Sequence, residues 1–169
     1  KGFYQADRLI VAAGAWLPKL LGGPFEKLLK IHRQVLHWFD TDGDPLQFAP
    51  QNFPVFIWEL PNAHQGIYGF PVVDGGLKVA TEQYGNTTLP DAVSRDVAPR
   101  EIVQMYEDFV RPYLKNVSPR SVKAKTCLYT VTPDAGFILD RLPQSERIVV
   151  ASCCSGHGFK HSAAIGEIL

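Results

Sequence analysis

The feature that most constrains this chain is a series of strand-like segments separated by short turns between residues 31 and 81. Residues 31–40 alternate in hydrophobicity and are dense in aromatic and β-branched side chains, which is typical of a strand. Further strands are predicted at residues 55–60, 65–70 and 77–81. Gly75-Gly76 indicates a hairpin turn before the last of them. Consecutive strands with short connections favour an antiparallel sheet.

One helix is predicted clearly, from Pro99 to about Tyr113. Its apolar face is formed at helical spacing by Ile102, Met105, Tyr106 and Phe109. Pro99 is tolerated in the first turn, because the N–H that proline lacks would have no partner there. A long strand is predicted at residues 121–132, and short strands are predicted at 8–13, 137–140 and 148–152. A short helix is predicted at residues 16–21, ended by Gly22-Gly23-Pro24. The expected class is α+β (α/β), with a mixed, largely antiparallel sheet and flanking helices.

The composition excludes several classes of function. The 17 basic residues balance the 17 acidic ones, so neither nucleic acid nor an anionic membrane is an expected partner. No apolar run approaches the length of about 18 residues that a membrane span needs. The three cysteines, Cys127, Cys153 and Cys154, fit neither a disulfide framework nor a metal site, which favours a reducing, cytoplasmic setting and predicts no metal. The first residue is not methionine and the last predicted helix runs to the final residue, so we expect a truncated chain.

The C-terminal segment combines a strand, a glycine-rich turn and the start of a helix. The strand at 148–152 leads into Gly156-His157-Gly158, and a helix is expected from about Phe159 to the end. Glycines without a Cβ let a flat cofactor approach the backbone, and the N–H groups at a helix start attract electron-rich groups. By itself, this pattern also fits a tight turn in any α/β protein.

Several motifs, in order along the chain, resemble the monomeric sarcosine oxidase and N-methyltryptophan oxidase family of D-amino-acid-oxidase-like flavoproteins. The family's C-terminal signature is matched by Ser155-Gly156-His157-Gly158-Phe159-Lys160. The segment that holds its flavin-linked cysteine is matched by Thr126 to Thr130, followed by Pro133-Asp134 and residues 137–140. Tyr68-Gly69-Phe70-Pro71, Gly76-Leu77-Lys78, Arg33-Gln34 and the segment from Ala6 to Trp16 match further blocks.

The resemblance implies roles for individual residues around FAD. Cys127 would form a thioether to the 8α-methyl of the flavin. Lys78 would lie near the flavin N5, where a fixed cation stabilises the negative charge that develops on O₂. Lys160 would pair with the substrate carboxylate. Taken alone, Cys127 also fits a buried structural cysteine and Lys78 a solvated lysine on a strand.

The remaining site residues are also implied by the resemblance. His157 would lie near flavin and substrate, and Tyr68 and Tyr129 would line the substrate cavity. The backbone at Gly14, Gly156 and Gly158 would contact the cofactor. Tyr68, Lys78 and His157 form the expected catalytic set, and both tyrosines also fit simple packing on a sheet.

The chain departs from the family pattern at three places. Glu82 stands where the family often has a histidine, so Glu82 is expected to change which amine is accepted. Cys153-Cys154 replaces the usual Gly-Phe and is expected to crowd the turn, and His161 replaces a phenylalanine. No GxGxxG phosphate-binding loop occurs in the 169 residues, and the family carries it near its N-terminus.

We therefore expect part of an FAD-dependent oxidoreductase that oxidises a secondary or N-methyl amino acid to an imine. Molecular oxygen would reoxidise the flavin and give hydrogen peroxide. Residues 1–28 would be a remnant of the Rossmann-like FAD domain, residues 29–125 the substrate domain, and residues 126–169 a flavin-contacting segment that returns to the FAD domain. Because the phosphate-binding loop is missing, this segment alone is expected to lack FAD and activity.

Three alternatives remain open at the level of sequence. The first is a flavin amine dehydrogenase that passes electrons to a carrier other than oxygen. The second is a non-catalytic ligand-binding or interaction module, which the departures at Glu82 and Cys153-Cys154 favour. The third, an α+β domain without a ligand, leaves the ordered motif matches unexplained.

Overall fold

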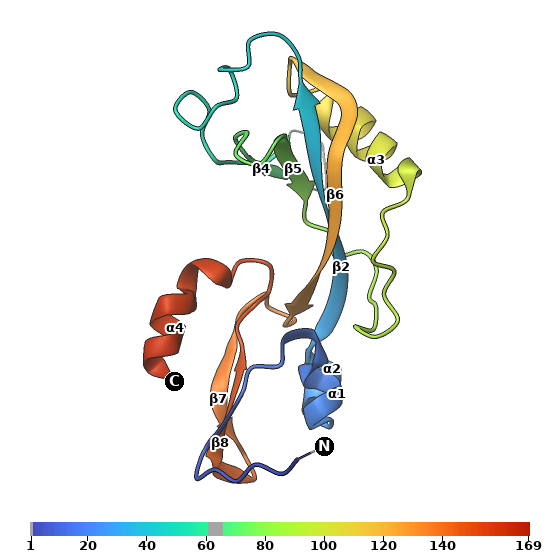
Figure 1. Ribbon diagram of the computed structural model, residues 1–169. Helices are drawn as coiled ribbons and strands as arrows, with labels where there is room; N and C mark the ends of the chain where they lie inside the picture. The colour runs from blue at the N-terminus through green and yellow to red at the C-terminus, as the bar shows by residue number, and fades with distance from the viewer. Residues whose placement is uncertain (1, 61–65) are drawn as a thin grey trace. The chain divides into compact units, whose positions relative to one another are not determined.

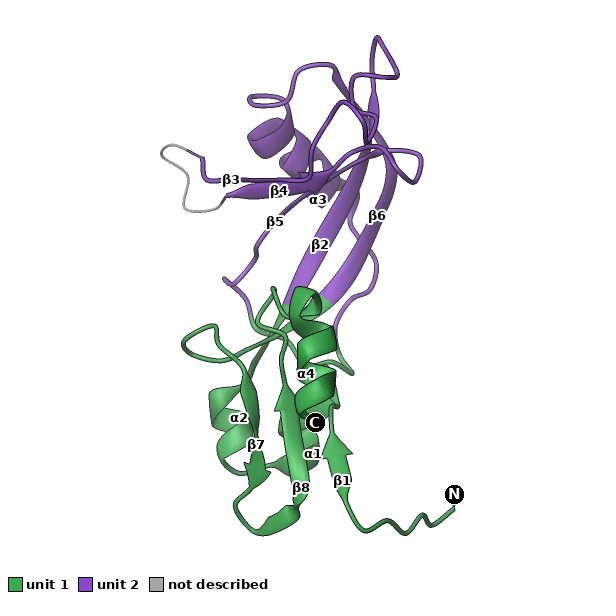
Figure 2. Cartoon of the chain, turned by 90° about the vertical axis from the view of Figure 1, so that its left-hand side faces the viewer, with its two compact units in different colours: residues 1–32, 87–92, 128–169 green, residues 33–86, 93–127 purple. Residues whose placement is uncertain are grey.

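A computed structural model describes residues 2–60 and 66–169 (Figure 1). The chain divides into two compact units (Figure 2). Unit 1 comprises Lys1–His32, Thr87–Ala92 and Leu128–Leu169, and unit 2 comprises Arg33–Asn86 and Val93–Cys127. Each unit has its own cluster of buried apolar side chains. No helix in the described ranges has the length and apolar character that a membrane crossing requires.

A five-stranded sheet, ordered β3-β4-β5-β2-β6, is the main element of unit 2. Its strands are β2 (Lys30–Thr41), β3 (Phe56–Trp58), β4 (Ile67–Phe70), β5 (Leu77–Thr81) and β6 (Val117–Val131). The pairs β3–β4, β4–β5 and β5–β2 are antiparallel, which confirms the predicted class of sheet. The first residues of β2 and the last of β6 belong to unit 1.

One face of this sheet forms the core of unit 2. Leu77 and Val79 of β5 are fully buried with Phe39 and Ile67, and α3 (Pro99–Met105) packs on this face through Met105. Because successive side chains of a strand point to opposite faces, Lys78 lies on the other face of β5. The sheet therefore has one face that forms the core and one that carries the lysine singled out from the sequence.

The helix predicted at 99–113 begins where expected, but it changes from α-helical to π-helical hydrogen bonding after Met105. Pro99 occupies the first turn, and the Glu101 carboxylate accepts a hydrogen bond of 2.9 Å from the N–H of Ala98. After Met105 the chain forms a π-helical turn, Tyr106–Val110, in which the Arg111 N–H donates to the Tyr106 carbonyl at 2.8 Å. Pro112 follows directly and has no N–H to continue the helix.

Unit 1 contains a three-stranded sheet of order β1-β8-β7. Its strands are β1 (Leu9–Val11), β7 (Ile138–Leu142) and β8 (Ser145–Ser152). β1 is parallel to β8, whereas β7 and β8 form an antiparallel hairpin. The sheet is mixed, and Val11 and Val150 pack with Leu17 and Leu29 in the core of unit 1.

Three short helical segments follow β1, and one of them was not predicted. They are η1 (Gly14–Trp16), α1 (Leu17–Leu21) and α2 (Pro24–Leu28). Gly22, with a φ of 64°, ends α1 as the sequence suggested. Pro24 follows the end of α1 and also occupies the first turn of α2, because the fixed φ of proline suits that position.

The predicted strand, glycine turn and helix are present at the C-terminus. β8 ends at Ser152, the turn covers residues 153–158, and η3 (Phe159–His161) leads into α4 (Ser162–Ile168). Elsewhere the structure adjusts the predicted bounds. β3 is shorter than residues 55–60, β6 begins before residue 121, and the part of the predicted strand at residue 65 lies outside the described residues.

Candidate functional site

Lys78 lies between two aromatic side chains of neighbouring strands. In the register of the sheet, Trp38 of β2 and Phe70 of β4 stand directly opposite Lys78 of β5. The Lys78 Nζ atom is 4.6 Å from the ring centroid of Phe70 and 5.4 Å from that of Trp38. Both distances lie in the range of a cation–π attraction. Lys78 is half-buried and so is not a fully solvated strand lysine.

Three influences act on the pKa of Lys78. Burial lowers this pKa below its usual value, the negative charge of a Cys127 thiolate raises it, and the positive charge of Lys123 lowers it. Together these influences lower the pKa of Lys78. Cys127 and Lys78, which the sequence motifs placed in one site, therefore interact electrostatically within unit 2.

Tyr68 lies near Lys78 on the neighbouring strand, and Glu82 follows the strand that carries Lys78. Tyr68 of β4 pairs with Ala80, two residues from Lys78, and so points to the same face as Lys78. Glu82 is exposed and follows the last residue of β5. The backbone at Gln83 is fixed by the Gln34 side-chain amide, which donates to the Gln83 carbonyl at 2.6 Å and accepts from the Gln83 N–H at 2.7 Å. The position of Glu82 is therefore held by its neighbour in the chain.

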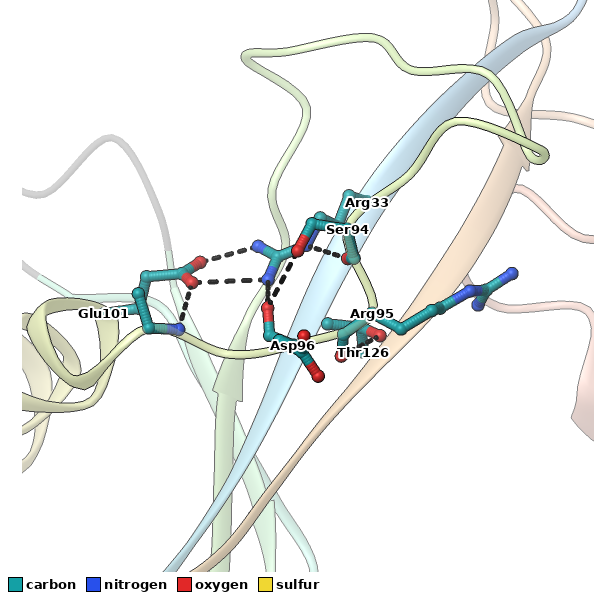
Figure 3. Close-up of polar contacts among 7 residues, drawn as sticks. Arg33, Ser94, Arg95, Asp96, Glu101 and Thr126 are labelled. Atoms are coloured by element: carbon teal, nitrogen blue, oxygen red, sulfur yellow. Dashed lines mark hydrogen bonds and ion pairs between the residues drawn. The ribbon is translucent and has the colours of Figure 1, made fainter.

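A cluster of polar contacts centred on Arg33 supports the strand that carries Cys127 (Figure 3). The Arg33 guanidinium donates to both carboxylate oxygens of Glu101, at 2.6 and 3.3 Å, and to the carbonyls of Ser94 and Asp96, at 3.0 and 2.9 Å. Arg33 holds the pKa of Glu101 below its usual value through these hydrogen bonds.

The same segment also contacts β6 next to the cysteine. The Thr126 hydroxyl donates to the Arg95 carbonyl at 3.1 Å (Figure 3). Cys127 itself is half-buried. The Arg33 cluster therefore links the segment before α3 to the residue that precedes Cys127.

In unit 1 the glycine turn is attached to the loop after β6. The N–H of Ser155 donates to the Thr130 carbonyl at 2.9 Å, and its hydroxyl donates to the Gly136 carbonyl at 2.7 Å and accepts from the Thr132 N–H at 3.3 Å. Ser155 is almost completely buried and has a φ of 39°. Asp134 supports the same loop, because its carboxylate accepts from the Thr132 hydroxyl at 2.7 Å.

These contacts give a physical reason for two of the motifs. The serine of the C-terminal signature and Pro133-Asp134, which are separate in sequence, form one hydrogen-bonded structure. The sequence singled out the motif but did not assign Ser155 this structural role, because the partners of its hydroxyl are about 20 residues away along the chain.

His157 is exposed but held in one orientation. Its ring lies 4.8 Å from that of Phe137 in a stacked arrangement, and its Nε2 atom lies 2.8 Å from the Ala135 carbonyl oxygen. A carbonyl can only accept, so Nε2 carries the proton and donates. In the neutral imidazole the Nδ1 atom is then the acceptor. The ring of His161 also contacts Phe137, at 5.6 Å between centroids.

The three glycines predicted to face the cofactor differ in their surroundings. A Cβ on Gly158 would overlap the backbone carbonyl of Cys153, so the turn requires glycine there. Gly156 has a φ of 81°, a left-handed conformation that favours glycine. Gly14 is exposed with a φ of 53°, and no atom lies within 4 Å of the place that a Cβ would occupy. Gly14 therefore leaves room for a ligand to approach the backbone.

The remaining predicted site residues lie at the edges of these elements. Lys160 is exposed in η3, and Tyr129 is half-buried on β6. The turn closes with Cys153-Cys154 in place, because the Cys154 carbonyl accepts from the N–H groups of His157 and Gly158, each at 2.9 Å. Cys153 is partly buried, and burial raises the pKa of its thiol.

The structure thus groups the predicted residues in two sets. Unit 2 contains Tyr68, Lys78, Glu82 and Cys127, and unit 1 contains Gly14, Tyr129, Gly156, His157, Gly158 and Lys160. Trp38 and Phe70 were not predicted as neighbours of Lys78. Their proximity depends on strand register, and in the sequence they are ordinary aromatic strand residues. No cluster of potential metal ligands occurs among residues 2–60 and 66–169.

The fold and these sites define the class of protein. A family model described as FAD dependent oxidoreductase (DAO) matches residues 1–169, so the chain belongs to this family of FAD-dependent oxidoreductases. The predicted family and fold class are confirmed.

Curated relatives narrow the similarity further. The chain is 38% identical to monomeric sarcosine oxidase of Streptomyces avermitilis over 98% of its own length, and 35% identical to human peroxisomal sarcosine oxidase over 98%. It is 34% identical to N-methyl-L-tryptophan oxidase of Yersinia pestis over 99% of its length. The chain spans only 43–44% of these relatives.

Solved structures show the same fold. Fructosamine oxidase (Amadoriase II) from Aspergillus fumigatus superposes with a TM-score of 0.71 at 22% identity, covering 99% of this chain and 41% of that one. NikD, an amino acid oxidase of nikkomycin biosynthesis, superposes with a TM-score of 0.69 at 20% identity, covering 95% and 43%.

The residues of this chain fit the flavin that the family implies. The backbone at Gly14 is open to a ligand, whereas the space at Gly158 is filled by the Cys153 carbonyl. Unit 2 presents a half-buried cation between two aromatic rings, and Cys127 influences the pKa of this cation. The open backbone at Gly14 and the cation in unit 2 suit contact with a flat, redox-active ring system.

Proposed function

We propose that this chain supplies the substrate-facing and flavin-contacting parts of an FAD-dependent oxidase of secondary or N-methyl amino acids. The observation that carries the proposal is the setting of Lys78, a half-buried cation between the rings of Trp38 and Phe70 on the same face of the sheet as Tyr68. Cys127, from a motif almost 50 residues further along the chain, influences the pKa of Lys78, and the two groups are those expected to meet the reactive ring. The names of the relatives, sarcosine and N-methyl-L-tryptophan oxidases, support this substrate class.

The FAD that the family implies would supply the redox chemistry: the substrate would lose a hydride from the carbon next to nitrogen and a proton from the nitrogen, and these two electrons and two protons would convert O₂ into hydrogen peroxide. The imine product would be hydrolysed by water. The residues of this chain would bind, orient and stabilise charge around that chemistry.

Individual residues would have distinct roles. Lys78 would stabilise the negative charge that develops on oxygen. Cys127 would bind the flavin covalently, for which its thiolate is the reactive form, and a neighbouring cation favours the thiolate. Tyr68, Tyr129 and Glu82 would contact the substrate, and Lys160 would attract its carboxylate.

The remaining contacts concern the cofactor and the backbone around it. His157 would present its Nδ1 acceptor near flavin and substrate. Gly14 and Gly156 would let the ring system approach the main chain, and Gly158 would keep the turn that faces the cofactor closed. We assign unit 2 to the substrate domain and unit 1 to the FAD-binding side. Residues 1–169 alone would bind FAD weakly and show little turnover, because the relatives are more than twice as long.

The test uses the complete protein that carries this chain, with N-methyl amino acids as substrates. We expect oxygen-dependent release of hydrogen peroxide from sarcosine or a bulkier N-methyl amino acid. Lys78→Met is expected to slow reoxidation of the reduced flavin by O₂ at least about a hundredfold, while flavin reduction under anaerobic conditions changes much less. Fast turnover with an artificial electron acceptor, but none with O₂, would identify a dehydrogenase and contradict the proposal.

A further inference from the structure

We infer that Trp38 is a positioning residue for Lys78. The Trp38 ring contacts the ammonium groups of both Lys78 and a second lysine, Lys123, and holds the Lys78 ammonium on its face of the sheet. The inference rests on the proposed role of Lys78 in oxygen reduction. Trp38 and Lys123 stand outside the sequence motifs.

The strand register places one aromatic ring on each side of Lys78. Trp38 and Phe70 are the direct cross-strand partners of Lys78, from β2 and β4. Side chains directly opposite each other in an antiparallel pair lie close together on one face. The lysine side chain therefore rises between two rings, 5.4 and 4.6 Å from their centroids.

A second cation contacts the same tryptophan. The Lys123 Nζ atom lies 4.5 Å from the Trp38 ring centroid and is paired with the Asp74 carboxylate at 2.8 Å. Lys123 interacts with Lys78 unfavourably, because like charges repel and the pKa of Lys78 is lowered. Asp74 pairs with Lys123, and the ring of Trp38 therefore contacts two cations, Lys78 and Lys123.

Neighbouring aromatic rings suit a lysine that must stabilise an anion. A carboxylate partner would neutralise the ammonium and occupy its N–H donors, whereas a ring attracts the charge and leaves the donors available. Within the described residues, the structure records no ion pair between Lys78 and a carboxylate. The rings also restrict a flexible side chain that would otherwise sample many rotamers.

The test compares Trp38→Leu, which removes the ring, with Trp38→Phe, which keeps a smaller one, in the complete flavin-loaded protein. For Trp38→Leu we expect reoxidation of the reduced flavin by O₂ to slow about tenfold, with anaerobic flavin reduction nearly unchanged. Trp38→Phe is expected to retain most of the rate. A purely structural role would slow both half-reactions together.

A second readout does not depend on activity. Reductive methylation with ¹³C-formaldehyde gives Lys78 an NMR signal that is assigned by its loss in Lys78→Met. We expect this signal to be shifted by the neighbouring rings, to move toward the position of a solvated lysine in Trp38→Leu, and to titrate at higher pH in Lys123→Met. Lys125→Met, which removes the same charge from the same strand, should leave the titration midpoint unchanged.

The outcomes separate the inference from the proposed function. Unchanged reoxidation and an unchanged NMR signal in Trp38→Leu would overturn the inference, as would equal losses in Trp38→Leu and Trp38→Phe. If Trp38→Leu does not fold, the NMR signal of Trp38→Phe decides, because the smaller ring should shift the Lys78 signal less. A signal at the wild-type position in Trp38→Phe overturns the inference. If Lys78→Met leaves reoxidation unchanged, the proposed role of Lys78 fails, while the NMR signal still reports whether the rings hold the lysine.

Discussion

At the scale of the residue, Gly158 shows how one missing atom determines a turn. Its φ is an ordinary −72°, so conformational freedom is not the reason for glycine there. The reason is space, because a Cβ would overlap the backbone carbonyl of Cys153, and backbone cannot move away as a flexible side chain can. The glycine turn is therefore specified by close packing between its two ends.

This packing predicts the effect of a single methyl group. Gly158→Ala is expected to lower the free energy of unfolding by more than about 2 kcal/mol, measured by urea denaturation. Gly166→Ala is the matched control, because Gly166 lies inside α4 and no atom is within 4 Å of its added Cβ. That control should stabilise the protein by up to about 1 kcal/mol. Equal effects of the two substitutions would contradict this account of the turn.

His37 is a second residue whose environment makes a prediction. It is 2% exposed, its Nδ1 atom has no hydrogen-bond partner among the residues that the structure describes, and burial lowers its pKa from 6.5 to about 4. Glu101 raises this pKa and Arg33 lowers it, each by less than burial does. The folded protein therefore holds His37 neutral at a pH where the unfolded chain would bind a proton.

The consequence is a loss of stability in mild acid. Because the folded pKa lies below the unfolded one, the contribution of His37 is complete above about pH 6.5 and falls as the pH drops toward 4, by up to about 3 kcal/mol. His37→Leu should flatten the curve of unfolding free energy against pH between these values. A curve that keeps its slope in the variant would show that other groups cause the acid sensitivity.

At the scale of the element, the Arg33 cluster fixes the start of α3. Glu101 both binds Arg33 and caps the helix at Ala98, and its side chain is 30% exposed. Glu101→Ala is expected to cost about 2 kcal/mol in unfolding free energy, because it leaves a partly buried guanidinium without its carboxylate. The comparison is Glu107→Ala, which removes only the exposed i,i+4 pair with Arg111 and should cost less than about 0.5 kcal/mol. A cost for Glu101→Ala no larger than that of Glu107→Ala would contradict the assigned role.

The elements also show what the sequence could and could not predict. Local sequence patterns were sufficient for the strand Leu77–Thr81, for the start of α3 and for the strand and helix at the C-terminus. A glycine pair precedes the first, a proline begins the second, and a glycine-rich turn joins the last two. It was not sufficient for the π-helical turn at Tyr106–Val110, which depends on packing, or for α2. Gly22-Gly23-Pro24 was interpreted as the end of one helix, although the proline also begins the next.

The residues of the candidate site also differ in how far the sequence could predict them. Lys78 and Cys127 could be found because they stand in recognisable motifs. Trp38 and Phe70 could not, because only the pairing of three strands places them beside Lys78. The supporting contacts of Ser155 were likewise invisible, since they join residues about 20 positions apart.

At the scale of the whole molecule, each unit carries its own set of proposed functional residues. Unit 2 contains Lys78 and Cys127 with the rings of Trp38 and Phe70, and unit 1 contains the glycine turn with His157 and Lys160. The chain spans less than half of its curated relatives. The proposed chemistry therefore belongs to the complete protein, with this chain providing residues that orient and stabilise.

The most direct measurement of the central claim is the visible absorbance of the complete protein after acid precipitation, compared with that of Cys127→Ser. We expect about one flavin per protein molecule to remain with the wild-type precipitate, and the flavin of Cys127→Ser to stay in the supernatant. A wild-type protein that contains no flavin, or a Cys127→Ser variant that keeps its flavin attached, would contradict the account.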